Sequence, residues 1–333
     1  MEKKKYSIDL VDQIRANDEL PPQKYIWGGI TPGSLGFVYG PPKSGKTTFC
    51  ENLGMCIAYG KSDFFGYKIE NNDPQKVLFI SMEEYWRART ERNKKQLSRM
   101  EVAEELKSNY MVVNENFPRV FLNNDDLKNR LQEIIDETKP NIVFIDSMTR
   151  MASKEIEDSS VCSAISLILR ELANSNGVAI IVIHHTHKLN GNAISIDSLA
   201  GSRVLAQEAD FMIGINRTVN GHRYYKEVAM RYGQEKEDIM LFEIDDNQWL
   251  FPFEEMAEHK VLELTDRRRK PEKIEEVISA IQDLYKQNVT VTKPIIVNKL
   301  KGKIEKSQTY LYLNKLELDG IIKMENMNIT LIQ

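Results

Sequence analysis

Short apolar runs recur along roughly the first 250 residues of the chain. Runs that are almost wholly apolar fit strands that are buried on both faces, as the strands of a parallel sheet are. We predict strands of this kind at residues 35–39, 77–80, 111–113, 142–145, 178–183 and 211–215.

Between these runs lie stretches whose apolar residues recur at helical spacing. They cover residues 47–59, 85–106, 125–138, 160–173 and 196–209, and Asn124 is the expected N-cap of the third. Strands that alternate with helices in this way predict an α/β fold, in which helices cover a mostly parallel sheet.

The end of this α/β region has a different pattern. Asn220-Gly221 separates two extended segments, 213–219 and 223–230, and Asn-Gly is a strong signal for a hairpin turn. Further extended segments follow at 239–244 and 248–251. We therefore expect antiparallel strands to complete one edge of the sheet.

The chain changes character after residue 252, where a predicted linker covers residues 253–270. Beyond it the pattern predicts helices at 272–287, 294–300 and 306–318, an extended piece at 290–292, and a hairpin of 321–324 with 329–332. Three helices and a hairpin of this size are typical of a winged helix-turn-helix domain. The expected layout is an N-terminal segment (1–26), an α/β domain (27–252), the linker, and a small winged-helix domain (271–333).

The third helix of that small domain offers polar side chains to a duplex DNA groove or its phosphates. They are Ser307, Gln308, Thr309, Tyr310, Asn314 and Lys315. The same module could instead contact a protein or pack subunits together, and the sequence leaves both readings open.

Composition changes the picture little, but the distribution of charge adds to it. The chain has 41% hydrophobic and 28% charged residues and a net charge of −4. Residues 266–333 carry 13 Lys and Arg against 9 Asp and Glu, so a basic tail follows an acidic body. No run of 18 apolar residues and no signal-peptide pattern is present. We expect a cytoplasmic protein without a membrane partner.

One motif carries specific chemistry. Gly40-Pro-Pro-Lys-Ser-Gly-Lys46-Thr47 matches the pattern GxxxxGK[ST] between a predicted strand and a predicted helix. In such a loop, backbone N–H groups wrap a polyphosphate, the lysine bridges the outer phosphates and the hydroxyl ligates magnesium. The sequence therefore predicts ATP and Mg²⁺ as cofactors, with Thr47 as a metal ligand. The residues expected to contact the nucleotide are Gly40, Pro41, Pro42, Lys43, Ser44, Gly45, Lys46, Thr47 and Thr48.

Three further candidates follow other predicted strands. Asp146 ends the strand 142–145 and would order water on the magnesium ion. Glu83 and Glu84 follow the strand 77–80, and one of them could activate the attacking water. We select Glu83, because Glu84 fits better the role of an acid that stabilises the first turn of a helix.

A run of histidines, His184-His185-Thr186-His187, follows the longest predicted strand. It could hold a metal ion, be structural, or sense the γ-phosphate of a nucleotide. The spacing is poor for a metal site, so we select His185 as the sensor.

Together these motifs resemble the RecA-like ATPases, and most closely the RepA-type hexameric helicase branch (AAA_25-like), which is related to DnaB and KaiC-like proteins. The resemblance covers about Trp27 to Phe251. It implies a RecA-like fold and identifies Phe79 to Glu83 as the strand that ends in the catalytic glutamate. In the RepA version of the sensor, His185 takes the place that glutamine holds in RecA and DnaB.

The resemblance also implies a residue that acts on a neighbouring subunit. Val228 to Gly233 aligns with the strand end that carries a basic residue into the neighbour's nucleotide site, here Arg231. Ala229 stands where DnaB has a companion lysine. Two alternatives therefore stay open: the finger could be Arg203 or Arg217 instead, or Arg231 could be a surface arginine without this role. Such a finger implies a homo-oligomer, with a hexameric ring as the expected form.

In such a ring, single-stranded nucleic acid would pass through the centre and touch the loops after Asp146 and His185. Those loops offer Arg150, Lys154 and Lys188. We therefore expect an ATP hydrolase that acts as an oligomeric nucleic-acid motor of the replicative-helicase type. The alternatives are an ATP-gated DNA-binding regulator or replication-initiation adaptor that does not unwind DNA, and a recombinase-like filament.

Overall fold

The structure, a computed structural model, describes residues 7–22, 24–69, 75–152, 159–186, 189, 192–199, 202–217, 222–233, 236–258, 260–261, 272–287, 289–304, 306–325 and 328–332. The chain divides into two compact units, residues 1–266 and 267–333. No helix within the described ranges combines the length and the apolar character needed to cross a membrane.

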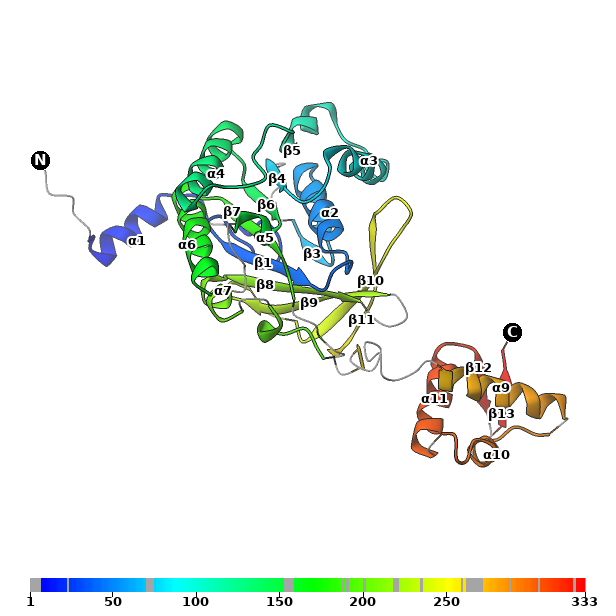
Figure 1. The fold of residues 1–333 in the computed structure, drawn as a ribbon. Coiled ribbons are helices and arrows are strands. Elements are labelled where there is room, and N and C mark those ends of the chain that lie inside the picture. Colours follow the sequence, from blue (N-terminus) through cyan, green and yellow to red (C-terminus); the bar gives the residue numbers. More distant parts are fainter. Residues whose placement is uncertain are drawn as a thin grey trace, which may run out of the picture. The chain divides into compact units, whose positions relative to one another are not determined.

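A large twisted sheet forms the centre of the first unit (Figure 1). The strands run in the order β11-β10-β9-β8-β1-β7-β6-β4-β5. The parallel strands are β1 (Leu35–Gly40), β4 (Val77–Ser81), β5 (Tyr110–Val112), β6 (Ile142–Asp146), β7 (Ala179–His185) and β8 (Phe211–Arg217). The antiparallel strands are β9 (Arg223–Met230), β10 (Asp238–Ile244) and β11 (Leu250–Ala257). The predicted mostly parallel sheet with an antiparallel edge is confirmed.

Helices cover both faces of this sheet (Figure 1). One face packs against α4 (Asn124–Thr138), α6 (Ser159–Asn176) and α7 (Ser202–Glu208). The other packs against α2 (Lys46–Ala58) and a small hairpin of β2 (Asp63–Phe64) and β3 (Tyr67–Lys68). Neighbouring residues of one strand serve opposite faces, as Phe37 and Val38 do in β1. Burial on both faces explains why the strands read as continuous apolar runs.

Two predicted helices are shorter in the structure than in the sequence pattern. The helix expected at 85–106 is α3 (Trp86–Leu97), followed by a 3₁₀ segment, η1 (Glu104–Asn109). The Ser98 hydroxyl donates to the Lys95 carbonyl oxygen at 2.6 Å, a local bond that competes with continuation of the helix. The helix expected at 196–209 is divided into η2 (Ile196–Ser198) and α7, because Leu199 forms a β-bridge with Thr186.

Helix ends also differ from the prediction in places. The N-cap of α4 is Asn123 rather than Asn124, since the Asn123 side chain accepts a hydrogen bond from the Asp126 N–H at 2.9 Å. A helix that the sequence pattern did not indicate, α1 (Leu10–Asp18), lies in the N-terminal segment. A four-residue helix, α5 (Met148–Met151), follows β6.

The end of the first unit also corrects the predicted linker. Strand β11 continues to Ala257 because it pairs with β10 along its length, with Asp238 opposite Ala257. The first residues of the predicted linker 253–270 are therefore part of the sheet. The predicted turn Asn220-Gly221 lies outside the described residues, although β8 and β9 pair as the expected hairpin.

The second unit has the elements predicted for it, namely α9 (Glu272–Lys286), α10 (Lys293–Lys299), α11 (Lys306–Leu318) and a hairpin of β12 (Ile322–Glu325) with β13 (Asn328–Leu331). They enclose a small core of their own. Thr309, expected to contact DNA, is instead buried, because its position on α11 faces that core. The side chains of Ser307 and Gln308 lie outside the described part of the chain.

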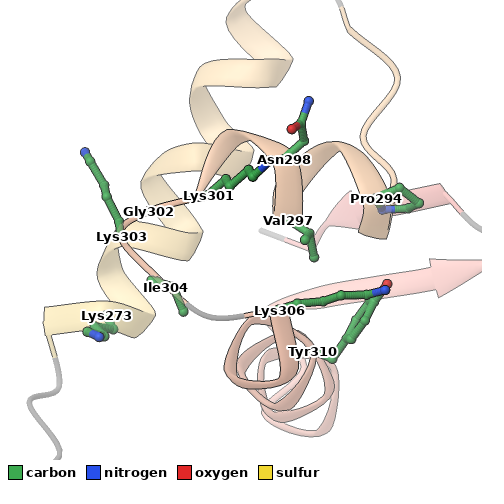
Figure 2. A pocket seen from close by; sticks show the side chains of 10 residues that line it. All are labelled: Lys273, Pro294, Val297, Asn298, Lys301, Gly302, Lys303, Ile304, Lys306 and Tyr310. Carbon is green, nitrogen blue, oxygen red and sulfur yellow. The ribbon is translucent and has the colours of Figure 1, made fainter.

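A pocket opens on the surface of this second unit (Figure 2). Among the described residues its lining is basic and includes no acidic side chain: Lys273, Pro294, Val297, Asn298, Lys301, Gly302, Lys303, Ile304, Lys306 and Tyr310. The Lys306 ammonium lies 5.9 Å from the centre of the Tyr310 ring.

Candidate nucleotide-binding and catalytic site

The loop between β1 and α2 has the shape of a phosphate cradle. Gly45 forms the N-cap of α2 with φ +105°, a conformation that glycine adopts without strain. At Gly40, a Cβ atom would lie 1.9 Å from the Ile215 carbonyl oxygen, so only glycine lets β8 approach this closely. The Ser44 hydroxyl is buried and has no hydrogen-bond partner among the described residues. An orphaned donor inside a glycine-shaped loop fits an anionic ligand such as a nucleotide phosphate.

Lys46 closes the loop on itself in this structure. Its ammonium donates to the carbonyl oxygens of Gly40 at 3.0 Å and Pro41 at 2.9 Å. Burial lowers the pKa of Lys46 to about 8, an effect that the nearby Asp146 and Glu83 carboxylates oppose. The ammonium is thus held at the loop by two neutral acceptors, which a phosphate oxygen could replace with a charge-assisted bond.

Two oxygen ligands meet where α2 begins and β6 ends. The Thr47 hydroxyl donates to the Asp146 carboxylate at 2.8 Å, and Asp146 is only 6% exposed. Burial raises the pKa of Asp146 to about 6, while the hydrogen bond from Thr47 lowers it. A hydroxyl and a carboxylate beside a phosphate cradle are the oxygen donors that Mg²⁺ prefers, so these residues fit the predicted metal.

Glu83 lies beside this pair, because Ser81 at the end of β4 pairs with Asp146. Its carboxylate accepts hydrogen bonds from the hydroxyls of Ser147 and of Thr149, the latter at 3.1 Å. The His185 Nε2 atom lies 4.0 Å from the same oxygen. The His185 ring and the two hydroxyl donors lower the pKa of Glu83 to about 2, against the effect of burial. Glu83 is therefore ionised at neutral pH, as a proton acceptor must be.

Glu84 is held in a different place. The Arg92 guanidinium donates to both of its carboxylate oxygens, at 2.8 and 2.5 Å, and also to the Glu51 carboxylate at 2.7 and 2.8 Å. Glu51 lies on α2 and is fully buried. Glu84 is thus committed to an ion-pair network between α2 and α3, which agrees with the structural role that its sequence position favoured.

His185 reaches the site because β7 runs beside β1, where Gly40 pairs with His185. His184 is buried, whereas the His185 side chain is 35% exposed. His187 and Lys188 lie outside the described residues. Among the described side chains, no group of three His, Cys, Asp or Glu residues is placed to hold a metal ion.

Residues 3–191 match the model of the AAA domain family, AAA_25, which is more than half of the chain. The chain belongs to the AAA domain family. Its fold is that of the RecA-like P-loop ATPases, as the resemblance of its motifs implied. Membership of this family makes the protein a P-loop ATPase that binds nucleotide.

Two curated proteins resemble this AAA domain protein in sequence. DNA repair protein RadA of Halalkalibacterium halodurans is 26% identical over 250 residues, 73% of this chain and 45% of that protein. DNA repair protein RadA of Listeria monocytogenes is 24% identical over 230 residues, 67% of this chain and 42% of that protein. The chain spans less than half the length of these relatives.

Two solved structures are similar to the AAA domain protein in fold. The ATPase domain of G40P has a TM-score of 0.54 at 15% identity, covering 75% of this chain and all of that domain. A KaiC-like protein of Pyrococcus horikoshii has a TM-score of 0.49 at 16% identity, covering 70% of this chain and all of that protein.

Arg231 is not brought to the nucleotide loop of its own chain. Met230, which precedes it, pairs with Phe211 at the start of β8, and Phe211 in turn pairs with Gly36 near the start of β1. The loop lies at the other end of β1, roughly 15 Å away at the usual rise per residue of a strand. Arg231 donates to the buried Asp210 carboxylate at 2.9 Å, and its side chain is 53% exposed.

The segment of Arg231 packs against the turn that precedes β1. A Cβ atom on Gly29 would lie 1.7 Å from the Tyr232 carbonyl oxygen, so glycine is required there by contact. Arg170 also donates to Asp210, so that carboxylate holds two arginines. Arg203 lies on α7, and Arg217 ends β8.

Sequence reasoning missed one arginine of the AAA domain protein that does lie at the loop. The Arg223 side chain lies against Gly45: a Cβ atom there would be 3.1 Å from its Cδ and 3.2 Å from its Nε. The predicted hairpin around Asn220-Gly221 could have revealed it. A hairpin places the ends of its two strands close together, and β8 runs parallel to β1 and therefore ends beside the nucleotide loop.

Proposed function

We propose that this P-loop ATPase is a magnesium-dependent motor that assembles from copies of itself into a ring, with the hexamer as the expected form, and moves along single-stranded nucleic acid. One observation carries the proposal. Lys46, Thr47, Asp146, Glu83 and His185 gather at one end of the sheet, whereas Arg231 stands at the other end and is half exposed. That separation supports a site shared between two chains.

In the proposed reaction, Lys46 binds the outer phosphates of ATP, and Thr47 and Asp146 would hold magnesium. Bound magnesium would neutralise charge on the transferred phosphoryl group. Glu83 accepts a proton from the attacking water, and its hydrogen bonds to Ser147 and Thr149 orient its carboxylate. His185, which lies beside Glu83, reports the presence of the γ-phosphate. Arg231 of one chain stabilises charge in the site of the next.

The likeness to DNA repair protein RadA supports nucleic acid as the substrate of the motor. Of the central-loop candidates, Arg150 lies on α5 and is exposed, while Lys154 and Lys188 lie outside the described residues. Few cations line these loops, so backbone hydrogen bonds are proposed to contribute to strand binding.

The Glu83→Gln variant tests the catalytic role. It should keep ATP affinity within about threefold and lower the rate of hydrolysis by at least about a thousandfold, because a carboxamide cannot accept the proton. Undiminished turnover would remove Glu83 from its role. Glu84→Gln is the matched control, since it changes the neighbouring carboxylate that pairs with Arg92; it should retain most of the turnover.

Mixed assemblies test the shared site. Arg231→Ala chains retain the nucleotide loop, and Lys46→Ala chains retain the finger. Each variant alone should be inactive, while a mixture should regain hydrolysis at interfaces that combine one intact loop with one intact finger. A mixture without any activity would contradict a site built from two chains.

The basic pocket of the second unit favours a second function, an ATP-gated regulator that binds duplex DNA through residues 271–333 (Figure 2). Lys301 and Lys303 are exposed, and in the described part of the chain neither has an ion-pair partner. A strand-displacement assay with ATP separates the two functions: unwinding supports the motor, and sequence-selective duplex binding without unwinding supports the regulator. Lysine-to-alanine changes at 301 and 303 should weaken duplex binding and flatten its salt dependence only in the second case.

A further inference from the structure

Arg223 occupies the side of the nucleotide loop that the catalytic residues leave open. In the sheet, β7, β6 and β4 lie on one side of β1, and β8 and β9 lie on the other. Gly214 of β8 pairs with Tyr39, next to the start of the loop, and Arg217 at the end of β8 pairs with Arg223. Two arginines therefore stand opposite each other beside the phosphate cradle.

The Arg223 guanidinium lacks the partners that a half-buried cation needs. Its Nε atom is buried and has no hydrogen-bond acceptor among the described residues, and no described carboxylate forms an ion pair with it. Burial and the positive charge of Arg217 lower the pKa of Arg223. A desolvated cation next to a like charge costs free energy, and a bound anion would offset that cost.

The carboxylates nearest in the sheet are engaged by other cations. Glu243, on the strand that pairs with β9, lies 3.0 Å from the His222 ring nitrogen. Asp245, two residues further, pairs with Arg99. The four residues that follow Arg217 in the sequence, 218–221, are Thr, Val, Asn and Gly and include no acid. The anion for Arg223 must therefore come from outside the described chain.

We propose that Arg223 binds a non-terminal phosphate of the nucleotide held in the loop of its own chain, with Arg217 adding to the positive field. The Nε atom lies 3.2 Å from the position of a Cβ on Gly45, so the guanidinium is already at the rim of the cradle. Planar guanidinium groups suit phosphate because two N–H groups can donate in parallel. Glu83 and His185, the residues proposed to act at the γ-phosphate, lie on the β7 side of the loop. Arg223 lies on the opposite side, so we assign to it a phosphate that is present in both ATP and ADP.

This inference rests on the proposed nucleotide site and names a phosphate-binding residue distinct from both Lys46 and the Arg231 finger. It predicts that Arg223 stabilises ATP and ADP alike, whereas a γ-phosphate sensor would stabilise ATP alone. It also predicts that Arg223 does not contact the base, so the binding of tripolyphosphate should depend on Arg223 as the binding of ADP does.

The test is calorimetric titration of the full chain with ADP, with tripolyphosphate and with adenosine, each in magnesium buffer, and with ATP in the Glu83→Gln background. Arg223→Ala and Arg223→Gln should lower the affinities for ADP, ATP and tripolyphosphate by a similar factor of about 10 to 100, the usual loss for a bond between charged groups. Arg223→Lys, which retains the charge but not the paired donors, should lie between them and the parent. Lys226→Ala is the control, because it removes a cation from the same strand as Arg223, but one that forms an ion pair with Glu258.

Unchanged ADP affinity in Arg223→Gln, with a melting temperature like that of the parent, would overturn the assignment and leave the ATPase intact. If the Arg223 variants lost affinity for ADP and adenosine but not for tripolyphosphate, the assignment would also be overturned, in favour of a contact with the base. Absence of ADP binding to the unsubstituted protein would overturn the nucleotide site together with this inference. A protein that binds ADP but unwinds nothing would contradict only the motor.

Discussion

Two adjacent residues, Glu83 and Glu84, have different environments. Glu83 accepts hydroxyl donors beside Asp146, whereas Glu84 is neutralised by Arg92. Local sequence makes both of them acids at the start of a helix. The partner of each comes from a remote part of the chain, and that partner decides which carboxylate is available to water.

Asp146 gives a prediction for stability against pH at the scale of one residue. Its pKa in the folded protein is about 6, above the ordinary value of 3.8, so the folded state binds the extra proton between these values. Its contribution to the free energy of unfolding is therefore present below about pH 4 and is lost as pH rises through 6. Two pKa units correspond to at most about 3 kcal/mol.

The measurement is urea unfolding at pH 4, 5, 6 and 7 in EDTA, with the parent and Asp146→Asn compared at each pH. The stability of the parent relative to the variant should fall as pH rises through this window. A difference that stays constant, or that grows with pH, would contradict the raised pKa.

At the scale of elements, α2 and α3 are joined by a buried ion pair. Glu51 on α2 is fully buried and its carboxylate accepts two bonds from Arg92 on α3. Removing one member of a buried pair costs about 3–5 kcal/mol, and because Arg92 keeps Glu84 as a partner we expect the lower end of that range. We expect Glu51→Ala to destabilise the first unit by about 3 kcal/mol, whereas Glu104→Ala, which removes a solvent-exposed ion pair with Lys107, should change stability by less than about 1 kcal/mol. Denaturant midpoints measure both.

The contact between the turn before β1 and the Arg231 segment gives a second prediction at this scale. A methyl group at Gly29 would overlap the Tyr232 carbonyl, so Gly29→Ala must displace the segment that carries the finger. We expect ADP affinity to stay within about twofold and hydrolysis by the assembled protein to fall at least about tenfold, because a small displacement of a positioned group is costly in catalysis. Gly66→Ala is the control: the nearest atom to a Cβ there is a lysine amine at 3.9 Å, so the added methyl group displaces no backbone, although Gly66, unlike Gly29, has a positive φ. Full activity of Gly29→Ala would contradict the coupling.

At the scale of the whole molecule, the two compact units predict separable tasks. A chain that ends at Asp266 retains the sheet, both helical layers and every residue of the nucleotide site. It should fold cooperatively and bind ADP with the affinity of the full chain. Loss of ADP binding on this truncation would contradict the independence of the first unit. Under the regulator alternative, the same truncation should abolish duplex binding.

Much of the fold followed from sequence pattern, for a physical reason. Apolar strands, helical spacing and the glycine-rich loop depend on neighbours within a few residues, and β1 and α2 accordingly lie where the pattern predicted. Helix ends were less predictable. Ser98 ends α3 with a bond that the periodicity does not encode, and β11 runs past the predicted boundary because its pairing with β10 continues.

By itself, the sequence determined the nucleotide loop, the alternation of the main strands and helices along the chain, and the candidates Glu83, Asp146 and His185. These follow from local backbone chemistry and from the rule that parallel strands end at one edge of a sheet. Only the tertiary structure decided which carboxylate Arg92 neutralises, where Arg231 rests, and that Arg223 stands at the loop. Each of these depends on contacts between residues that are remote in the chain, and such contacts exist only once the sheet has formed.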